Sequence, residues 1–289
     1  MFNHVPFVQE IKTPFVVNSG VRLFMQRDDQ IHPFVSGNKW FKLKHNFRDF
    51  EASKATSILT FGGAYSNHLV ATAVACAMQQ IPCVGIVRGD ELKTNSNYIL
   101  RLCAEFGMTL KFVSREVYTT YKNDTSELEQ DETFVIPEGG DNASGILGCQ
   151  DMVKDYSLFD SVAVPVGTST TFSGVINGSR GQSHIHGFAA LKDASYLSEV
   201  VRDNTSFDNW TLQTKFSYGG FGRFDQSQSD FNKQFASETG ILLDPVYTGK
   251  MMRGIYAMIN ELQFKRGQKV LCIHTGGLTG LLSQKWLDS

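Results

Sequence analysis

Lys39 is the residue whose surroundings most clearly suggest chemistry. It follows Gly37-Asn38 and precedes Trp40-Phe41, in the first turn of a helix predicted over residues 39–50. The helix dipole is unfavourable to an ammonium there and the aromatic neighbours reduce hydration, so both lower the pKa of the amine. Condensation with a carbonyl requires a neutral amine. Lys42, about one turn on, lies near the same face and is a candidate phosphate ligand. The alternative for either lysine is a solvated side chain.

A glycine- and hydroxyl-rich loop follows the apolar segment 161–166. It consists of Gly167-Thr168-Ser169-Thr170-Thr171 and leads into a helix predicted to begin at Thr171. Such a loop points N–H groups and hydroxyls at one spot. The helix N-terminus adds about 0.3–1 kcal/mol, and phosphate is the usual occupant. The loop lacks the Walker and GxGxxG patterns. Taken alone, it fits equally a phosphate cup or a polar turn that caps a helix.

A third loop, Gly62-Gly63-Ala64-Tyr65-Ser66-Asn67-His68, also joins a predicted strand to a predicted helix. Ser66 or Asn67 could simply cap that helix. Alternatively, Asn67 could donate to a ring oxygen and Ser66 could exchange a proton with a substrate. A hydrolase elbow is excluded because the second glycine of G-x-S-x-G is missing.

Three further turn-like segments complete the set of candidate site loops. They are Pro137-Glu138-Gly139-Gly140-Asp141, Asp244-Pro245-Val246-Tyr247-Thr248-Gly249-Lys250 and His274-Thr275-Gly276-Gly277. Each alone indicates a turn. Their occurrence with the first three indicates a composite site.

Strand and helix patterns alternate along the chain, which predicts an α/β fold with parallel sheets. The predicted strands cover residues 23–26, 56–61, 82–88, 109–113, 133–136, 161–166, 184–191, 212–216 and 269–274. The predicted helices cover residues 39–50, 67–79, 97–106, 145–155, 194–202, 231–238 and 250–264, with another over 171–177. Ligands of such folds bind at the carboxyl ends of strands, where the glycine-rich loops fall. The polar stretch 121–131 is expected to be an exposed excursion.

Bulk composition narrows the class of function. The 289 residues carry a net charge of -2, which argues against nucleic acid or an anionic membrane as a partner. We expect no signal peptide, and no run of about 20 apolar residues occurs in the sequence. The five cysteines show no CxxC spacing or disulfide framework. A reducing cytoplasm is therefore the expected compartment.

Taken in order, these segments resemble the 1-aminocyclopropane-1-carboxylate deaminase / D-cysteine desulfhydrase family. The resemblance runs from Arg27-Asp28-Asp29 to His274-Thr275-Gly276-Gly277 and so covers most of the chain. It implies a pyridoxal 5'-phosphate enzyme of the tryptophan-synthase-β type, fold type II. Two parallel-sheet domains are expected, with the cofactor in the cleft between them. The large cofactor-binding domain would comprise residues 1–42 and 151–289, and the inserted smaller domain residues 43–150.

The resemblance also implies roles for individual residues. Lys39 would form the Schiff base with the cofactor, Lys42 would touch its phosphate, and Asn67 would bond its ring oxygen. Ser66 would bind the substrate carboxylate and assist proton transfer, and Tyr247 would face the substrate. The remaining cofactor contacts would come from Gly167, Thr168, Ser169, Thr170 and Thr171 around the phosphate and from Thr275 near the pyridine nitrogen. A neutral hydroxyl at that nitrogen leaves a weaker electron sink, which suits elimination.

Two positions separate the branches of this family. His68 and Thr248 match the desulfhydrase-like branch, whereas the deaminase branch has Gln and Glu there. Phe221 departs from the pattern because it stands where the family has a tyrosine. We therefore expect a lyase that releases ammonia and an α-keto acid from a small amino acid such as D-cysteine, with His68 and Phe221 among the substrate contacts.

Other hypotheses remain open at this point. They are a deaminase or racemase on the same scaffold, a pyridoxal-phosphate-binding protein with little turnover, and a phosphate-ligand enzyme without this cofactor. The resemblance implies a homodimer. His184 and His186 form an HxH pair, but the sequence offers no matching metal ligands, so no metal site is expected.

Overall fold

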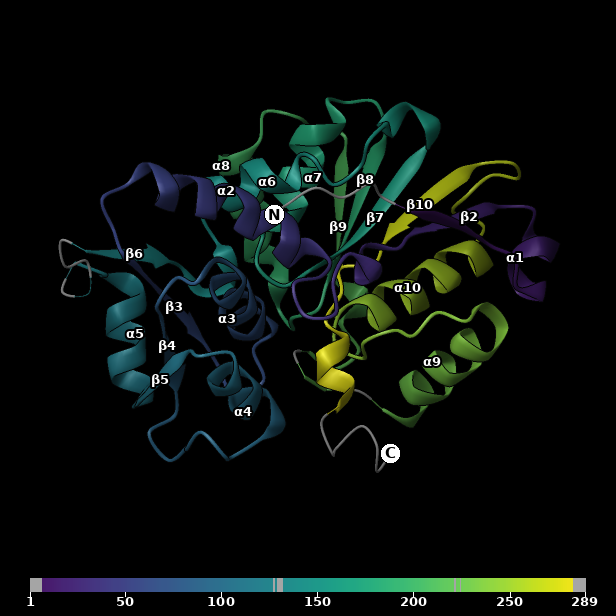
Figure 1. The fold of residues 1–289 in the computed structure, drawn as a ribbon. Coiled ribbons are helices and arrows are strands. Elements are labelled where there is room, and N and C mark those ends of the chain that lie inside the picture. Colours follow the sequence, from purple (N-terminus) through teal and green to yellow (C-terminus); the bar gives the residue numbers. More distant parts are fainter. Residues whose placement is uncertain (1–6, 127, 129–131, 221, 224, 283–289) are drawn as a thin grey trace.

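The computed structural model describes residues 7–126, 128, 132–220, 222–223 and 225–282. Within them the chain forms two sheets, one of six strands and one of four. Figure 1 shows the small sheet, labelled β3 to β6, beside the large sheet that contains β7 to β10. The expected α/β class with parallel sheets is thus confirmed.

The large sheet has the order β1-β2-β10-β7-β8-β9. All neighbouring strands are parallel except β1 and β2, which pair antiparallel. Its strands are β1 Val8–Ile11, β2 Arg22–Gln26, β7 Ser161–Val166, β8 His184–Ala189, β9 Trp210–Gln213 and β10 Lys269–Ile273. β7 is buried along its whole length, as its continuous apolar sequence requires of a central parallel strand.

The small sheet has the order β5-β4-β3-β6 and is entirely parallel. Its strands are β3 Ser57–Gly62, β4 Cys83–Arg88, β5 Thr109–Val113 and β6 Thr133–Ile136. In both sheets, the strand-to-helix loops with the candidate residues leave the carboxyl ends of β3, β6, β7 and β10. These ends are where parallel sheets place their ligands.

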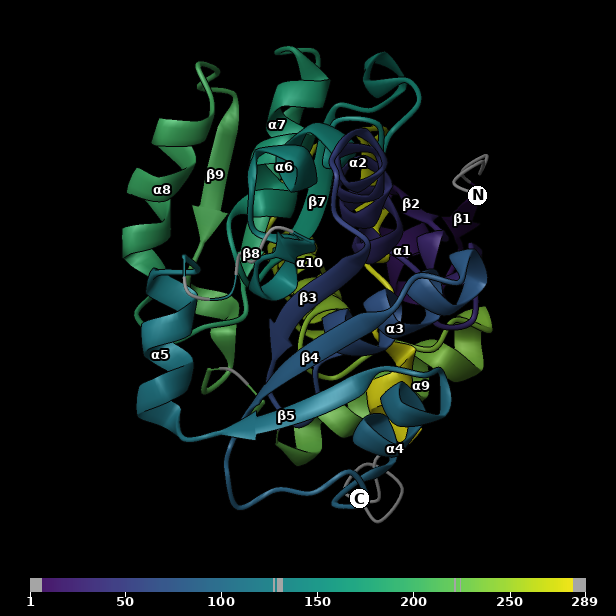
Figure 2. The same ribbon diagram turned by 60° about the vertical axis from the view of Figure 1, so that its left-hand side comes forward.

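Helices cover both faces of each sheet. They are α1 Pro14–Ser19, α2 Asn38–Ala52, α3 Asn67–Gln79, α4 Tyr98–Glu105, α5 Arg115–Asn123, α6 Ala143–Cys149, α7 Thr170–Ser179, α8 Leu197–Asn204, α9 Gln226–Thr239 and α10 Thr248–Asn260. Figure 2 shows α5 on the opposite side of the small sheet from α3 and α4. On the large sheet, α1, α9 and α10 share one apolar cluster with β2 and β10.

The principal apolar core joins the two sheets. It contains Phe47 of α2, Leu69 of α3 and Phe172 of α7, together with Val162 of β7. α2 bridges the sheets because it packs against α6 as well as α3. Truncating one of the buried phenylalanines to alanine removes a large side chain from such a core, which typically costs about 3–5 kcal/mol.

Most predicted elements agree with the structure to within a few residues, but two predicted segments are wrong in part. The helix expected over 145–155 ends at Cys149, and Gln26 Nε2 donates to the Met152 carbonyl at 2.6 Å, which holds that stretch in a non-helical form. The strand expected over 212–216 is instead Trp210–Gln213, because it pairs with Ile185–Phe188 of β8. The chain then turns at residues 215–217, where Phe216 is buried.

Among the α-helices and strands of the described residues, β1, α1 and α5 had no counterpart in the sequence prediction. β1 and α1 are short. α5 buries only Tyr118, and its segment is otherwise mostly polar. Part of the predicted excursion at 121–131 belongs to α5, and residues 127 and 129–131 lie outside the described part of the chain.

Candidate active site

Lys39 lies in the first turn of α2, and the backbone just before this helix lies against the turn that follows β10. The preceding Gly37 has φ 58°, and a Cβ there would stand 2.0 Å from the Thr275 carbonyl carbon. Only glycine permits both the backbone conformation and this approach. The glycine of Gly-Asn-Lys thus holds the start of the helix against the backbone of Thr275, two residues before Lys39.

Lys39 is partly buried, and the pKa of its amine lies close to neutral pH. Burial first, and then the neighbouring Lys42 ammonium, lower its pKa from 10.5 to about 7, although Cys149 and Asp141 act in the opposite direction. Its Nζ donates to Asn38 Oδ1 at 3.3 Å, and Asn38 Nδ2 donates to Thr171 Oγ1 at 2.9 Å. The amine expected to be nucleophilic is therefore tied to the start of α7.

The loop between β7 and α7 leaves a helix N-terminus open. Ser169 occupies the N-cap position in the αR conformation, and its side chain makes no capping hydrogen bond. Ser169, Thr170 and Thr171 are all buried. Of the two interpretations that the sequence left equal, a self-capping turn does not fit this geometry. An N-terminus without a side-chain cap at the end of a ten-residue helix suits an anion.

Lys42 completes this loop from α2. Its side chain is 1% exposed, and Nζ donates to the Gly139 carbonyl at 3.0 Å and to Thr168 Oγ1 at 3.4 Å. Burial lowers the pKa of Lys42 as well. A buried lysine beside hydroxyls and an open helix end is a fitting phosphate ligand, so residues 167–171 and Lys42 fit the phosphate of pyridoxal phosphate.

The small sheet contributes the loop after β3. Ser66 accepts a hydrogen bond from the Leu69 N–H at 3.3 Å and thereby caps α3. Asn67 Oδ1 accepts from Thr279 Oγ1 at 2.6 Å, which connects the start of α3 to the segment after β10. The structure thus brings the start of α3, with Ser66 and Asn67, to the segment that follows β10 of the large sheet.

The His68 side chain contacts Thr60 of β3. It is 2% exposed, and its Nε2 lies 2.8 Å from Thr60 Oγ1, which itself donates to the Ile136 carbonyl. Because the Thr60 hydroxyl donates its one hydrogen to the Ile136 carbonyl, it can only accept from His68. Nε2 of His68 is therefore the donor in the bond to Thr60. Burial and the charges of Lys39 and Lys42 lower the pKa of His68 well below its ordinary value. His68 is therefore a neutral residue behind Lys42.

Tyr247 approaches the phosphate loop from the large-sheet side. A Cβ at Gly167 would stand 2.9 Å from Tyr247 Cε1, so the ring packs on this glycine. The buried Asp244 accepts hydrogen bonds from the N–H groups of Val246, Tyr247 and Thr248 at 3.0, 2.6 and 2.8 Å. Asp244 thus fixes the start of α10 and with it the tyrosine. Burial raises the pKa of the Tyr247 hydroxyl, which keeps it protonated.

Two supporting residues were not identified from the sequence. Lys250 is 1% exposed and donates to the carbonyls of Ser217 at 2.7 Å and Gly220 at 2.5 Å. It therefore anchors the turn before α9. Its position in Asp-Pro-x-x-Thr-Gly-Lys was a visible signal, but a sequence does not distinguish a buried lysine from a solvated one. Asn38 is the other, because its amide connects Lys39 to Thr171.

Phe221 lies outside the described residues, so its predicted contact with substrate stays a prediction. The nearby Tyr218 stacks on the Arg253 guanidinium, with 4.0 Å between Cζ and the ring centroid, and packs near Phe216. This engagement with α10 and its neighbours occupies the Tyr218 ring.

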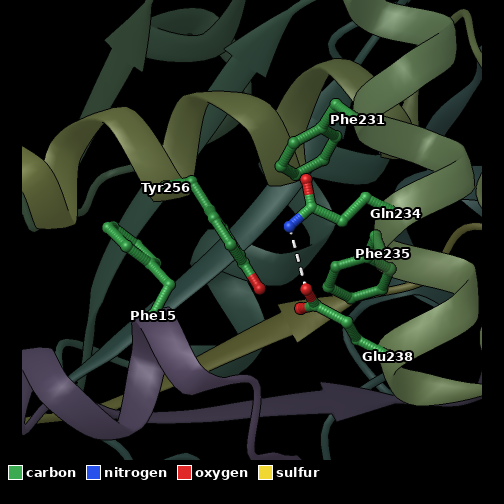
Figure 3. Close-up of a pocket in the computed structure, with 6 residues that line it drawn as sticks. All are labelled: Phe15, Phe231, Gln234, Phe235, Glu238 and Tyr256. Carbon is green, nitrogen blue, oxygen red and sulfur yellow. Dashed lines mark hydrogen bonds between the residues drawn. The ribbon is translucent and has the colours of Figure 1, made fainter.

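Two features lie apart from these loops. The rings of His184 and His186 are 4.6 Å apart, and the described residues offer no group of three metal-ligating side chains. A hollow of about 180 Å³ is lined by Phe15, Phe231, Gln234, Phe235, Glu238 and Tyr256. Figure 3 shows these side chains between α1, α9 and α10. None of these lining residues belongs to the candidate site.

Comparison with known proteins identifies the class of enzyme to which this fold and these loops belong. The model of the family described as "Pyridoxal-phosphate dependent enzyme" matches residues 10–276, and this chain belongs to that family. Pyridoxal phosphate is accordingly its cofactor. When bound, the cofactor supplies an electron sink for carbanion chemistry at an amino-acid substrate.

Individual relatives within this family show which of its members the chain resembles. A protein of Thermotoga maritima named "Putative 1-aminocyclopropane-1-carboxylate deaminase" is 31% identical, over 92% of this chain and 91% of that protein. The "Bifunctional D-cysteine desulfhydrase/1-aminocyclopropane-1-carboxylate deaminase, mitochondrial" of Arabidopsis thaliana is 28% identical, over 91% of this chain and 74% of that protein. The resemblance stated from the motifs is confirmed.

A solved structure described as an "ACC deaminase homologue" has the same fold. It superposes with a TM-score of 0.83 at 21% identity and covers 97% of this chain and 91% of its own. The expected fold type II architecture is therefore confirmed. Among the described residues, no helix is both long and apolar enough to cross a membrane.

Proposed function

We propose that this enzyme is a D-cysteine desulfhydrase-like lyase, which releases ammonia and an α-keto acid from a small amino acid. The group on Cβ, which is sulfide in D-cysteine, leaves with the electron pair of its bond. The observation that carries the proposal is that Asn38 connects Lys39 to the start of α7. The pKa of the Lys39 amine is lowered to about 7, and the start of α7 has no side-chain cap. An amine and an anion site joined in this way suit a ligand that carries both a carbonyl and a phosphate.

The residues of the chain then take separate roles. Lys39 Nζ would hold the cofactor and, once the substrate amine has displaced it, would be free to take the α-proton of the substrate. Gly167, Thr168, Ser169, Thr170 and Thr171 would hold the phosphate, with Lys42 as its cation. Asn67 would bond the ring oxygen, Thr275 would serve the pyridine nitrogen, and Ser66 and Tyr247 would face the substrate. These roles rest on the contacts above and on the match of each residue to its family motif.

The choice of D-cysteine over aminocyclopropane carboxylate rests on His68 and Thr248. Neither side chain supplies a carboxylate, and His68 is held neutral by burial. A ring-opening deaminase would have Gln and Glu at these two positions. A substrate with its own leaving group at Cβ needs less help from acidic groups, so elimination is favoured here.

Replacement of Lys39 tests the cofactor's attachment point. Lys39→Ala should lose the visible absorbance of the lysine-bound cofactor and reduce keto-acid release by about 10³-fold or more. Lys44→Ala is the matched control, because Lys44 lies on the same helix and pairs with Asp151 at the surface. Full activity without Lys39 would contradict the proposal.

A panel of D- and L-amino acids tests the reaction. Keto-acid release from D-cysteine, with little from aminocyclopropane carboxylate, is the expected result. Interconversion of enantiomers without keto acid would indicate a racemase. Bound cofactor without any product would favour a binding protein with little turnover, the alternative motivated by Phe221.

We also propose a cytoplasmic homodimer with the domain division stated above. The scattered cysteines, all of them free and buried, support a reducing compartment. The four strands of the small sheet all fall between Ser57 and Ile136, which supports an insertion at residues 43–150. Light scattering of the purified protein tests the oligomeric state, and limited proteolysis tests the division.

A further inference from the structure

We propose that Asp141 weakens the hold of the phosphate cup on a dianionic phosphate, so that the enzyme binds its cofactor less tightly than a neutral residue there would allow. The inference rests on the proposed function because it concerns the cup at residues 167–171. Asp141 follows Gly139-Gly140 and belongs to the small-sheet side of the site.

Asp141 directly contacts the cup. Its Oδ1 accepts a hydrogen bond from Thr170 Oγ1, and Thr170 is fully buried at the start of α7. Thr168 Oγ1 lies 3.0 Å from Thr170 Oγ1, and Lys42 Nζ donates to Thr168 at 3.4 Å. One chain of hydrogen bonds therefore runs from Lys42 through two cup hydroxyls to a carboxylate.

The direction of this chain follows from the chemistry of its ends. An ionised carboxylate only accepts and an ammonium only donates. Thr170 therefore gives its hydrogen to Asp141, and Thr168 gives its hydrogen to Thr170. Both hydroxyls turn their hydrogens toward Asp141. A phosphate that needs them as donors must compete with the carboxylate.

Charge adds to this competition. A phosphate monoester carries about -1.5 to -2 charges at neutral pH and would share the cup with Asp141, which repels it. Lys42 is the cation that offsets this repulsion, yet it also donates to Gly139. The other acidic group of the same loop, Glu138, is paired with Lys122 at 2.9 Å. Asp141 is thus the carboxylate that directly opposes the phosphate.

Hydration moderates the effect. Asp141 is exposed and borders a hollow of about 700 Å³ that also reaches Ser169 and Asp203. Water in this hollow screens the carboxylate. We therefore expect a change of about threefold to tenfold in affinity, smaller than a fully buried charge would give.

The test measures binding to cofactor-free protein. Asp141→Asn, close in shape, should bind pyridoxal 5'-phosphate and inorganic phosphate about threefold to tenfold more tightly than the wild type, by absorbance titration and calorimetry. Asp141→Ser, which keeps a hydroxyl beside Thr170, should show the same gain in affinity. It replaces the first variant in the test if Asp141→Asn folds poorly. Asp203→Asn removes the same charge from another part of the hollow and should leave both affinities unchanged.

The outcomes separate this inference from the proposed function. Unchanged or weaker binding in both Asp141 variants would overturn the inference, because Asp141 would then merely organise the hydroxyls. An equal gain in Asp203→Asn would also overturn it, because the effect would come from overall charge. Failure of the wild type to attach the cofactor at Lys39 would overturn the proposed function instead. Inorganic phosphate needs no attachment to Lys39, so its binding still tests Asp141.

Discussion

α3 and α7 begin in nearly the same way, yet only one of them closes its own N-terminus. Each follows a buried parallel strand and a loop rich in glycine and hydroxyl groups, and each has serine at the N-cap. Ser66 turns its hydroxyl onto the Leu69 N–H and caps α3. Ser169 makes no such bond, and the start of α7 stays open.

The difference lies in the backbone of the N-cap residue. Ser66 has φ -75° and ψ 113°, the extended form in which a side chain reaches back to the N3 amide. Ser169 has φ -69° and ψ -19°, already helical, so its hydroxyl is not directed at that amide. The same residue type therefore closes a helix in one loop and leaves the N–H groups for a ligand in the other.

The largest effect on this contrast is expected from displacing the start of α2, because this helix carries Lys39 and Lys42 next to the open start of α7. Gly37→Ala would place Cβ 2.0 Å from the Thr275 carbonyl at a residue with φ 58°. We expect a loss of about 3 kcal/mol or more in the free energy of unfolding, measured with denaturant, together with much weaker cofactor binding.

A second glycine separates the clash from the backbone strain. Gly107 has φ 84° with nothing within 4 Å of a Cβ, so Gly107→Ala should cost only about 1–2 kcal/mol and leave cofactor binding intact. Equal losses in the two variants would show that the contact with Thr275 is unimportant.

The sequence was sufficient for the parts of the molecule that depend on local pattern. The fully buried β7 and the helix over 67–79 follow directly from apolar runs and caps. The site loops were found because glycine and hydroxyl residues cluster after strands. What the sequence could not show was orientation. Nothing in the residue types tells that His68 faces Thr60, that Lys250 is buried, or that Asp141 touches Thr170, because these depend on contacts between segments distant along the chain.

The rate at which Lys39 reacts with an aldehyde should depend on pH. This rate tests the contrast because Asn38 links the amine of Lys39 to the open start of α7. The pKa of Lys39 is lowered to about 7, and an amine reacts with an aldehyde only when neutral. Below pH 7 the rate of modification should fall about tenfold per pH unit, and above it the rate should level off. Pyridoxal, which lacks the phosphate, followed by borohydride trapping and mass spectrometry, reports this rate at Lys39.

Lys42→Met provides the variant for this measurement. Removing the neighbouring ammonium removes a repulsion that lowers the pKa of Lys39, so the profile should shift to higher pH. Because pyridoxal makes no use of the phosphate cup, loss of the Lys42 contact with phosphate does not confuse the result. A profile that stays in place, or moves to lower pH, would mean that burial alone sets the pKa.

The smallest expected effects test the two serines against each other. Ser66→Ala removes the cap of α3 and should lower the free energy of unfolding by about 1 kcal/mol. Ser169→Ala removes no capping bond, so its stability should change by less than about 0.5 kcal/mol while the affinity for inorganic phosphate falls, since the hydroxyl lies at the open end of α7. Thermal and denaturant unfolding give the first quantity and calorimetry the second. The opposite pattern, with stability lost at Ser169 and phosphate affinity unaffected there, would mean that both loops are ordinary caps.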